Sequence, residues 1–317
     1  MDPRILKRIE SDLHTLNSHR PLKTHVLKKL QEQFTVDLTY HSNAIEGNQL
    51  TLKETYLVLR EGITVKGKNL KDHLEAKNHE EALQYLFEIT NKKQQTRISH
   101  ALIRSLHQLI VKDTEKSIAG KYRTTDVAIL GSKHRPVSGF QVQAEMDKFI
   151  HWMNRHEISL NPIEFAAQAH HQFVHIHPFE DGNGRTGRLL MNLILMRSGY
   201  PITIILKQDR KKYYQALESA DHKNLEPLTK LIAQAVERSL MIYIKAIRGT
   251  QKKSEELISL TELSETAPYS AKYLNLLVNK GLLQATKIGR NWYSTIDSLK
   301  EYESNRIRKR KRKDESQ

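Results

Sequence analysis

The chain has 317 residues, of which 38% are hydrophobic and 27% are charged, a composition typical of a globular protein with a sizeable core. Cysteine is absent, which excludes disulfide bonds and cysteine-ligated metal sites. No apolar run approaches the ~20 residues that span a bilayer and no signal-peptide pattern opens the chain, so we expect a cytoplasmic protein that contacts no membrane.

Hydrophobic periodicity predicts a mainly α-helical large domain over residues 1–248. Its first predicted helix covers 24–46, where Leu27, Leu30 and Phe34 recur at helical spacing, and Gly47 is placed to end it. Further helices are predicted at 52–61, 70–90 and 98–112. Residues 121–141 then break the helical pattern and predict a short, irregular β-hairpin.

The clearest helix start lies at Asn161, which can cap the helix, with Pro162 at the first helical position. We expect this helix to end near residue 174 and a second helix to follow Gly184. The second helix is apolar on nearly all sides from Leu189 to Met196, which indicates a buried position at the centre of the core. The last helices of the large domain are predicted at 209–220 and 225–248.

The C-terminal part has a different pattern. Residues 249–256 are polar and charged and are predicted to be a linker. Residues 257–303 predict a small domain of two short helices, a hairpin and a closing helix. The last segment, 304–317, is predicted to be a disordered basic tail, because residues 306–313 hold seven of the 51 Lys and Arg in a chain of formal net charge +15. Such a tail serves either solubility or contact with nucleic acid or an acidic partner.

The segment His177–Arg188 (HPFEDGNGRTGR) is a polar, Gly-punctuated loop between two strongly apolar predicted helices. Gly182 and Gly184 allow consecutive backbone N–H groups to point into one concavity. That concavity lies at a helix N-terminus, where the dipole and free N–H groups favour an anion. Arg185 and Arg188 are three residues apart and can reach the same side, so the segment predicts a polyphosphate cradle.

Two side chains beside the cradle can supply chemistry. Asp181 offers a hard oxygen ligand for Mg²⁺ shared with phosphates, and His177 can accept a proton from an attacking hydroxyl. Phosphoryl-type transfer needs little else. The alternatives are a purely structural loop and a metal centre built from the neighbouring histidines. Helical spacing divides His170, His171, His175 and His177 between faces, and they match no familiar zinc motif.

The loop resembles the signature of the Fic family, HPFx[D/E]GNGRxxR, and the resemblance extends over roughly residues 30–245. It implies a Fic-type helical fold with a hairpin flap, ATP and Mg²⁺ as ligands, and transfer of AMP to a Ser, Thr or Tyr hydroxyl of a target protein. It also implies that His177 is the general base and that Asp181 binds Mg²⁺. The phosphate-binding residues that it implies are Gly182, Asn183, Gly184, Arg185 and Arg188.

Position 184 helps to choose among reactions, because the related Doc-type kinases carry Lys there, whereas Gly favours attack on the α-phosphate. Two other functions stay open. One is a DNA-binding regulator whose Fic core is an ATP sensor, and the other is removal of AMP with Glu46 positioning water.

Ser42 and Glu46 are four residues apart and lie on one face of the first predicted helix. Beside a Fic core they resemble the inhibitory motif [S/T]xxxE[G/N] of one class of the family. The resemblance implies that Glu46 pairs with Arg188 and takes the place of the ATP γ-phosphate.

Two further segments resemble functional parts of the family. Tyr213 and Tyr214 resemble the segment that flanks the adenine, and Tyr214 is the candidate contact. The 121–141 segment resembles the flap that positions the target, although it also fits an ordinary connection.

Residues 259–303 resemble the winged helix-turn-helix modules of the excisionase and MerR type. The resemblance implies that the second helix enters the DNA major groove, with candidate phosphate contacts at Lys272, Lys280, Lys287 and Arg290. The alternative is a module that docks a protein or forms a dimer. The target protein and the oligomeric state are not readable from the sequence.

Overall fold

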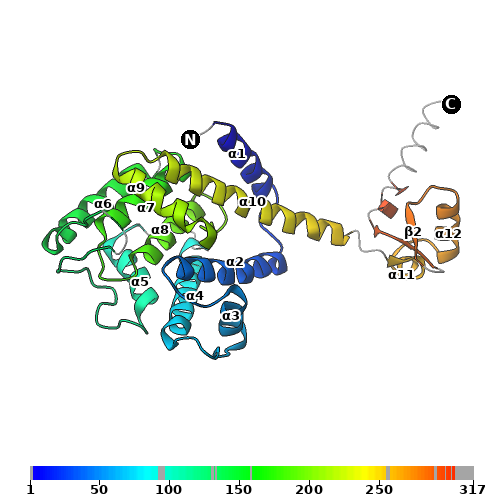
Figure 1. Cartoon of the computed structure of the whole chain (residues 1–317). Helices are drawn as coiled ribbons and strands as arrows, with labels where there is room; N and C mark the ends of the chain where they lie inside the picture. Colours follow the sequence, from blue (N-terminus) through cyan, green and yellow to red (C-terminus); the bar gives the residue numbers. More distant parts are fainter. Residues whose placement is uncertain are drawn as a thin grey trace. The chain divides into compact units, whose positions relative to one another are not determined.

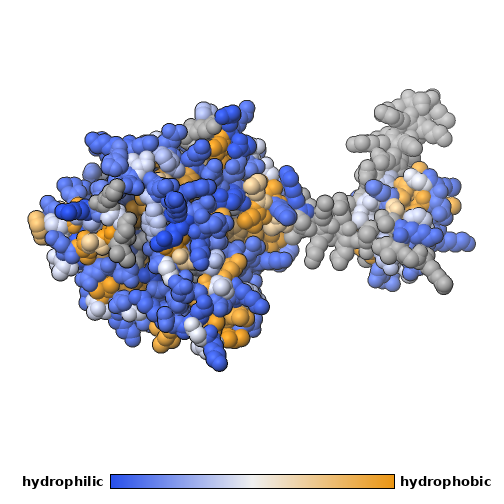
Figure 2. Space-filling model, in the orientation of Figure 1, coloured by the Kyte–Doolittle hydropathy of each residue, from blue (hydrophilic) through white to orange (hydrophobic). Residues whose placement is uncertain are grey.

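The computed structural model has two compact units, Met1–Ile244 (unit 1) and Lys245–Gln317 (unit 2) (Figure 1). The structure describes residues 3–91, 97–129, 132, 134–157, 159–254, 258–288, 291–296, 298–300 and 302–303. Within these ranges no helix is both long and apolar enough to cross a membrane. The face of unit 1 seen in Figure 2 is largely hydrophilic, with scattered hydrophobic side chains, as on an ordinary globular protein.

Unit 1 is a body of packed helices (Figure 1). Its described α-helices are α1 (Pro3–Asn17), α2 (Thr24–Ile45), α3 (Leu52–Tyr56), α4 (Leu70–Asn91), α5 (His100–Val111), α6 (Val142–His156), α7 (Pro162–Ile176), α8 (Asn183–Arg197) and α9 (Arg210–Asp221). The next helix, α10 (Glu226–Ser254), begins in unit 1 and ends beyond its boundary at Ile244. A π-helical turn, η1 (Leu57–Glu61), continues α3, and two 3-10 turns are η2 (Gly139–Gln141) and η3 (Lys207–Asp209).

The core of unit 1 is built around α7 and α8, which pack against each other. Asn161 caps α7 by accepting a hydrogen bond from the Ile163 N–H at 3.0 Å, with Pro162 at the first helical position. Every residue of α8 from Arg185 to Leu195 is buried, as its apolar sequence predicts. The cradle residues at the start of α8 therefore lie within the packed core of the unit.

The predicted helices from 24 to 112 and from 161 to 221 are confirmed with small shifts of their ends. The sequence analysis assigned no helix to α1 or α6, although Val142, Met146, Phe149 and Met153 form a buried helical stripe in α6. That stripe directly follows the irregular 121–141 segment. Because this segment has no helical periodicity, the start of α6 was not recognised in the sequence.

Two expectations differ from the structure. The described residues of 121–141, which we call the flap, form a loop and carry no paired strand, and the Ser132 N–H donates to the Ile129 carbonyl at 3.1 Å. The described part of the predicted linker 249–256, up to Ser254, is helical because α10 continues into it. A single glycine, Gly249, costs a helix only about 1 kcal/mol, and the Gln and Lys residues that follow are good helix formers.

The described residues of unit 2 include a three-stranded antiparallel sheet and short helices. Its elements are β1 (Ile258–Ser259), α11 (Leu260–Thr266), α12 (Ala271–Asn279), β2 (Ala285–Ile288) and β3 (Asn291–Ser294). The sheet order β1-β3-β2 adds one strand to the predicted hairpin. The tip of that hairpin, including Arg290, and the basic tail 304–317 lie outside the described residues.

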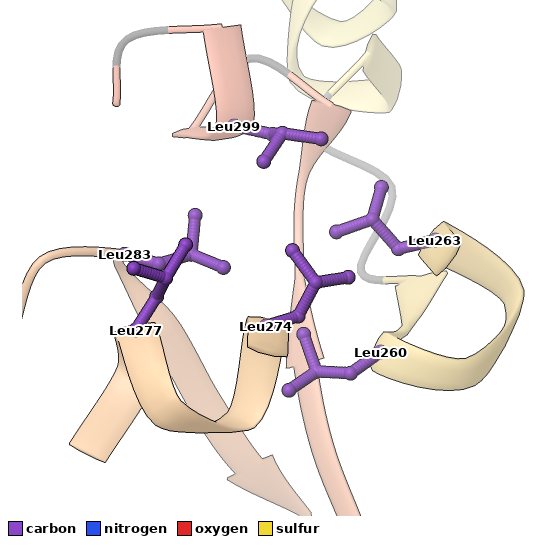
Figure 3. Packing of buried hydrophobic residues seen from close by; sticks show 6 residues of the cluster. All are labelled: Leu260, Leu263, Leu274, Leu277, Leu283 and Leu299. Atoms are coloured by element: carbon purple, nitrogen blue, oxygen red, sulfur yellow. The ribbon is translucent and has the colours of Figure 1, made fainter. Parts of the chain in front are cut away.

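Six buried leucines form the core of unit 2 (Figure 3). They come from both helices, from the segment between α12 and β2, and from the chain after β3: Leu260, Leu263, Leu274, Leu277, Leu283 and Leu299. Ser259 and Glu262 form a capping box that fixes the start of α11 against this core.

Replacement of Leu274, which is 0% exposed, should destabilise unit 2 alone. We expect Leu274→Ala to lower its free energy of unfolding by about 2–5 kcal/mol, because the lost methyl groups leave a cavity. The two tryptophans report on the units separately, since Trp152 lies in unit 1 and Trp292 in unit 2. Urea unfolding followed by Trp292 fluorescence in a Trp152→Phe background measures the change.

The matched control is Leu276→Ala in the same helix, because Leu276 is 45% exposed and its loss should cost about 0.5 kcal/mol or less. Equal effects of the two substitutions would contradict this description of the unit 2 core.

Candidate active site

The loop between α7 and α8 is held by its own backbone and by Asn183. His177 ends α7 with a left-handed φ of 53°, and Gly182 precedes α8 with a φ of 77°. The Asn183 side chain accepts a hydrogen bond from the Phe179 N–H at 2.9 Å and donates one to the Phe179 carbonyl at 2.8 Å. The side chain of Asn183 thus fixes the loop, and its backbone N–H lies at the first turn of α8.

His107, which the sequence analysis missed, supports the loop. Its Nδ1 accepts a hydrogen bond from the Gly120 N–H, so its Nε2–H donates to the Asp181 carbonyl, both at 3.0 Å. The ring stacks on Phe179 with a centroid distance of 3.6 Å, and burial lowers the pKa of His107 to about 4. The sequence feature that could have identified His107 is its position on the apolar face of the helix predicted at 98–112.

His177 is oriented to act as a base. Its Nδ1 lies 3.2 Å from the Val174 carbonyl, an acceptor that requires the proton on Nδ1 and leaves a lone pair on Nε2. Burial, and then the nearby Arg123 charge, lower the pKa of His177 to about 4. The imidazole is therefore neutral at pH 7 and able to accept a proton.

Arg123 fixes both His177 and the base of the flap, and no pattern in the sequence pointed to it. Its side chain is buried and donates to the His177 carbonyl at 2.7 Å. It also donates to the carbonyls of Thr125 at 2.8 Å and Val137 at 2.6 Å, which lie on the two arms of the flap. One guanidinium therefore couples the position of the flap to the backbone of the candidate base.

Arg188 is directed at the end of α2. It is 1% exposed, and it donates from Nε to the Ser42 hydroxyl at 3.0 Å and from Nη2 to the Ser42 carbonyl at 2.8 Å. Its Nη2 also lies 2.7 Å from Glu46 Oε1. Burial opposes the charge of Arg188, but Glu46 raises the pKa of Arg188 above its ordinary value, so the guanidinium stays charged.

The Glu46 carboxylate lies at the N-terminal turn of α8. A Cβ added to Gly184 would be 2.1 Å from Glu46 Oε1, so the carboxylate takes the space that a side chain at position 184 would fill. This is the end of the helix that attracts anions. Among the described residues, the buried Nη1 of Arg188 has no hydrogen-bond partner and can donate to a further acceptor.

Arg185 has different partners from Arg188, although the two were predicted to reach the same side. It is 2% exposed and lies between two carboxylates, with Nη1 3.0 Å from Glu75 and Nη2 3.4 Å from Asp181. Asn48 also donates to Glu75, at 2.8 Å. Glu75 on α4 is a site residue that the sequence analysis missed, because it is one of several glutamates on a charged helix.

Asp181 fits a magnesium ligand by exposure and charge. Its side chain is 47% exposed and its Oδ1 accepts a hydrogen bond from the Gly182 N–H at 2.6 Å. Burial raises the pKa of Asp181, but the Arg185 charge and this hydrogen bond outweigh that effect and lower it. The carboxylate is therefore ionised and open to solvent at the edge of the cradle.

The two tyrosines of α9 have different environments. Tyr213 is buried and its hydroxyl lies 2.7 Å from His170 Nε2, so it belongs to the core. Tyr214 is 37% exposed and its ring lies beneath the Arg210 guanidinium, 4.9 Å from the ring centroid. Its hydroxyl is 3.5 Å from the Ile45 carbonyl, next to Glu46, so Tyr214 stays the candidate adenine contact.

The fold is that of solved Fic-domain proteins. A Fic domain-containing signalling protein from Bacteroides thetaiotaomicron is 31% identical, with a TM-score of 0.71, and the match covers 77% of this chain and 97% of that one. Fic-1 from C. elegans is 33% identical with a TM-score of 0.69, and the match covers 77% of this chain and 72% of that one.

The chain belongs to the Fic/DOC family, whose model matches residues 97–195. A protein adenylyltransferase Fic from Nematostella vectensis is 36% identical over 245 residues, which are 77% of this chain and 56% of the relative. One from Drosophila virilis is 34% identical over 86% of this chain and 55% of the relative. The chain thus spans about half the length of these curated relatives.

Loss of the Glu46 charge should destabilise unit 1. We expect Glu46→Gln to lower the free energy of unfolding by about 1–3 kcal/mol, because the charge of Arg188 is then buried without its counterion. Urea unfolding followed by Trp152 fluorescence in a Trp292→Phe background checks this. The matched control is Glu80→Gln, which removes another partly buried Arg–Glu pair and should cost about 1 kcal/mol or less. A Glu46→Gln variant as stable as the parent would contradict the described contact.

The imidazole of His177 should titrate far below the ordinary range of histidine. We expect a midpoint near pH 4, because burial disfavours the charged ring. NMR titration of the histidine ring protons, assigned by the loss of one signal in His177→Gln, measures it. A role as a base requires the neutral ring, so such a role should persist above about pH 4 and disappear below it. A midpoint near ~6.5 would contradict the burial that the structure gives His177.

Proposed function

We propose that this chain transfers AMP from ATP to a hydroxyl group of a target protein or of a copy of itself. The proposal is supported by the neutral His177 ring beside a helix N-terminus that already holds a carboxylate. It is also supported by the relatives, which are named protein adenylyltransferase Fic.

The residues present are those that such a transfer needs. The hydroxyl oxygen attacks the α-phosphorus, the bond to the bridging oxygen breaks, and pyrophosphate leaves. His177 Nε2 takes the hydroxyl proton, with Nδ1 held by Val174. The backbone N–H groups after Gly182 and the guanidinium of Arg188 stabilise the charge on the phosphates. Magnesium held by Asp181 would supply further positive charge to the phosphates.

We propose that Glu46 inhibits this reaction. It occupies the anion-binding end of α8 and pairs with Arg188, so it competes with the γ-phosphate for the same guanidinium. An ATP whose γ-phosphate is not held presents a misaligned α-phosphate. A hundredfold inhibition corresponds to about 2.7 kcal/mol, which one charge-assisted pair can supply.

Removal of the Glu46 side chain should therefore activate the protein. We expect Glu46→Gly to raise incorporation of labelled AMP, including self-modification, by roughly a hundredfold. Addition of His177→Ala to that variant, or of EDTA, should abolish the incorporation. Labelled ATP and autoradiography measure the product, and mass spectrometry identifies the AMP group on Ser, Thr or Tyr.

The matched control is Glu180→Gln, an exposed carboxylate of the same loop that has no contact with Arg188 in the structure and should leave the rate unchanged. If Glu46→Gly does not increase AMP incorporation, Glu46 is not inhibitory. If the chain instead removes AMP that is already attached to the target, the reverse reaction is favoured.

We also propose that residues 257–303 are a winged helix-turn-helix domain that contacts DNA. The support is the arrangement of α11 and α12 beside a three-stranded sheet, with Lys272, Lys280 and Lys287 all exposed. Lys287 lies over the Trp292 ring at 5.8 Å, on the hairpin that would be the wing. Residues 1–248 would then be a separate catalytic domain.

DNA binding by the full chain should depend steeply on salt. We expect log K to fall linearly with log salt by about 0.9 for each phosphate that is neutralised. Lys272→Glu with Lys280→Glu should weaken binding and flatten the slope, whereas Lys28→Glu, an exposed lysine of unit 1, should change neither. Fluorescence anisotropy with duplex DNA measures the affinity. Binding without a salt slope, or no binding, would favour the protein-docking alternative.

A further inference from the structure

Three ligand-type side chains from separate segments meet outside the phosphate cradle. His134 lies in the flap, His175 in the last turn of α7 and Asp221 at the end of α9. One ligand atom from each lies within 4.8 Å of the others. All three residues are partly buried and partly open to solvent, so an ion can reach them.

Hydrogen bonds already orient these side chains. His134 Nε2 lies 2.8 Å from the His175 carbonyl, so Nε2 carries the proton and Nδ1 keeps a lone pair. The two rings stack with their centroids 4.0 Å apart. His175 Nδ1 lies 2.8 Å from Asp221 Oδ1. Two imidazoles and a carboxylate thus converge without rearrangement of the backbone.

His171 is a second partner of the same carboxylate. Its Nε2 lies 2.9 Å from Asp221 Oδ1, and it precedes His175 by one helical turn. The α7 helix does divide the histidines between faces, as predicted, because His170 faces Tyr213. That spacing argument does not cover the present group, since His171 and His175 share a face and His134 and Asp221 come from other segments. The spacing of residues in the sequence therefore does not predict that these four side chains lie close together.

The chemistry of the group suits a borderline transition metal rather than magnesium. Zn²⁺ takes His nitrogen at about 2.0–2.1 Å and carboxylate oxygen at about 2.0–2.2 Å, whereas Mg²⁺ prefers oxygen ligands alone. Metal-binding histidines ordinarily donate their other N–H to a carbonyl, as His134 does here. A ligating carboxylate is ordinarily hydrogen-bonded as well, as Asp221 is by His171.

We propose that His134, His175 and Asp221 bind a zinc-class divalent cation that fastens the flap to α7 and α9. The site is separate from Asp181 and takes a different metal. Its position has a consequence for the flap, because His134 lies between the two arms that Arg123 holds. Bound metal would fix the tip-side part of the flap as Arg123 fixes its base.

Zinc titration of the full chain tests the proposal. The protein is stripped with chelator and dialysed, and Zn²⁺ is added in competition with a chromophoric chelator. We expect one strong equivalent, weakened at least tenfold in His134→Ala and in Asp221→Asn and by about 10–100-fold in His171→Gln. The matched control is His151→Ala, an exposed histidine of α6, which should leave the equivalent intact.

A second readout separates a specific site from surface histidines and from misfolded variants. Hydrogen exchange of the peptides that cover the flap should slow on addition of Zn²⁺ in the parent chain and not in His134→Ala. Co²⁺ in place of Zn²⁺ should give visible absorption that Asp221→Asn removes. The proposal is overturned if the parent binds no strong equivalent, or if His134→Ala and Asp221→Asn keep the parent affinity. In that case the cluster is a set of metal-free His–Asp hydrogen bonds.

Discussion

The buried charge of Arg188 is the constraint on which the rest of the site depends. A guanidinium that is 1% exposed needs acceptors and a counterion, and the end of α2 supplies both through Ser42 and Glu46. The same guanidinium lies in the first turns of α8, where an anion is favoured. Under the proposed function, the Glu46 carboxylate and a nucleotide phosphate would compete for this one charge, and α2, which lies outside the family signature, would control access to it.

Around this charge the site is preorganised by residues that do not face the ligand. Asn183 holds the loop, His107 supports it from α5, and Arg123 holds the His177 carbonyl. Burial, together with the nearby charge of Arg123, keeps the His177 ring neutral, because these effects outweigh the Val174 hydrogen bond and the Glu46 charge that favour the protonated ring. A neutral base and a charged anion site thus result from one dense core around α7 and α8.

Those features of the site that depend on helical periodicity and on the spacing of nearby residues could be predicted from the sequence. Helical period located α8 and α2, and spacing placed Ser42 and Glu46 on one face, from which the family resemblance implied the pair with Arg188. The sequence did not predict which side chains pair with partners far away along the chain. Arg185 forms an ion pair with Glu75 instead of lying on the same side as Arg188. Arg123 donates to the His177 carbonyl from a loop that has no regular sequence pattern. Tertiary packing determines such partners, and it leaves no periodic pattern in the sequence. For the same reason the sequence did not predict that His134 and Asp221 lie close together.

The central claim is that Glu46 and a nucleotide phosphate occupy the same place on Arg188. A crystal structure of Glu46→Gly with Mg²⁺ and a non-hydrolysable ATP analogue tests it most directly. The account predicts the terminal phosphate on the Arg188 guanidinium and the α-phosphorus facing His177 Nε2. A nucleotide bound elsewhere, or one whose phosphates avoid Arg188 although Glu46 is absent, would contradict it.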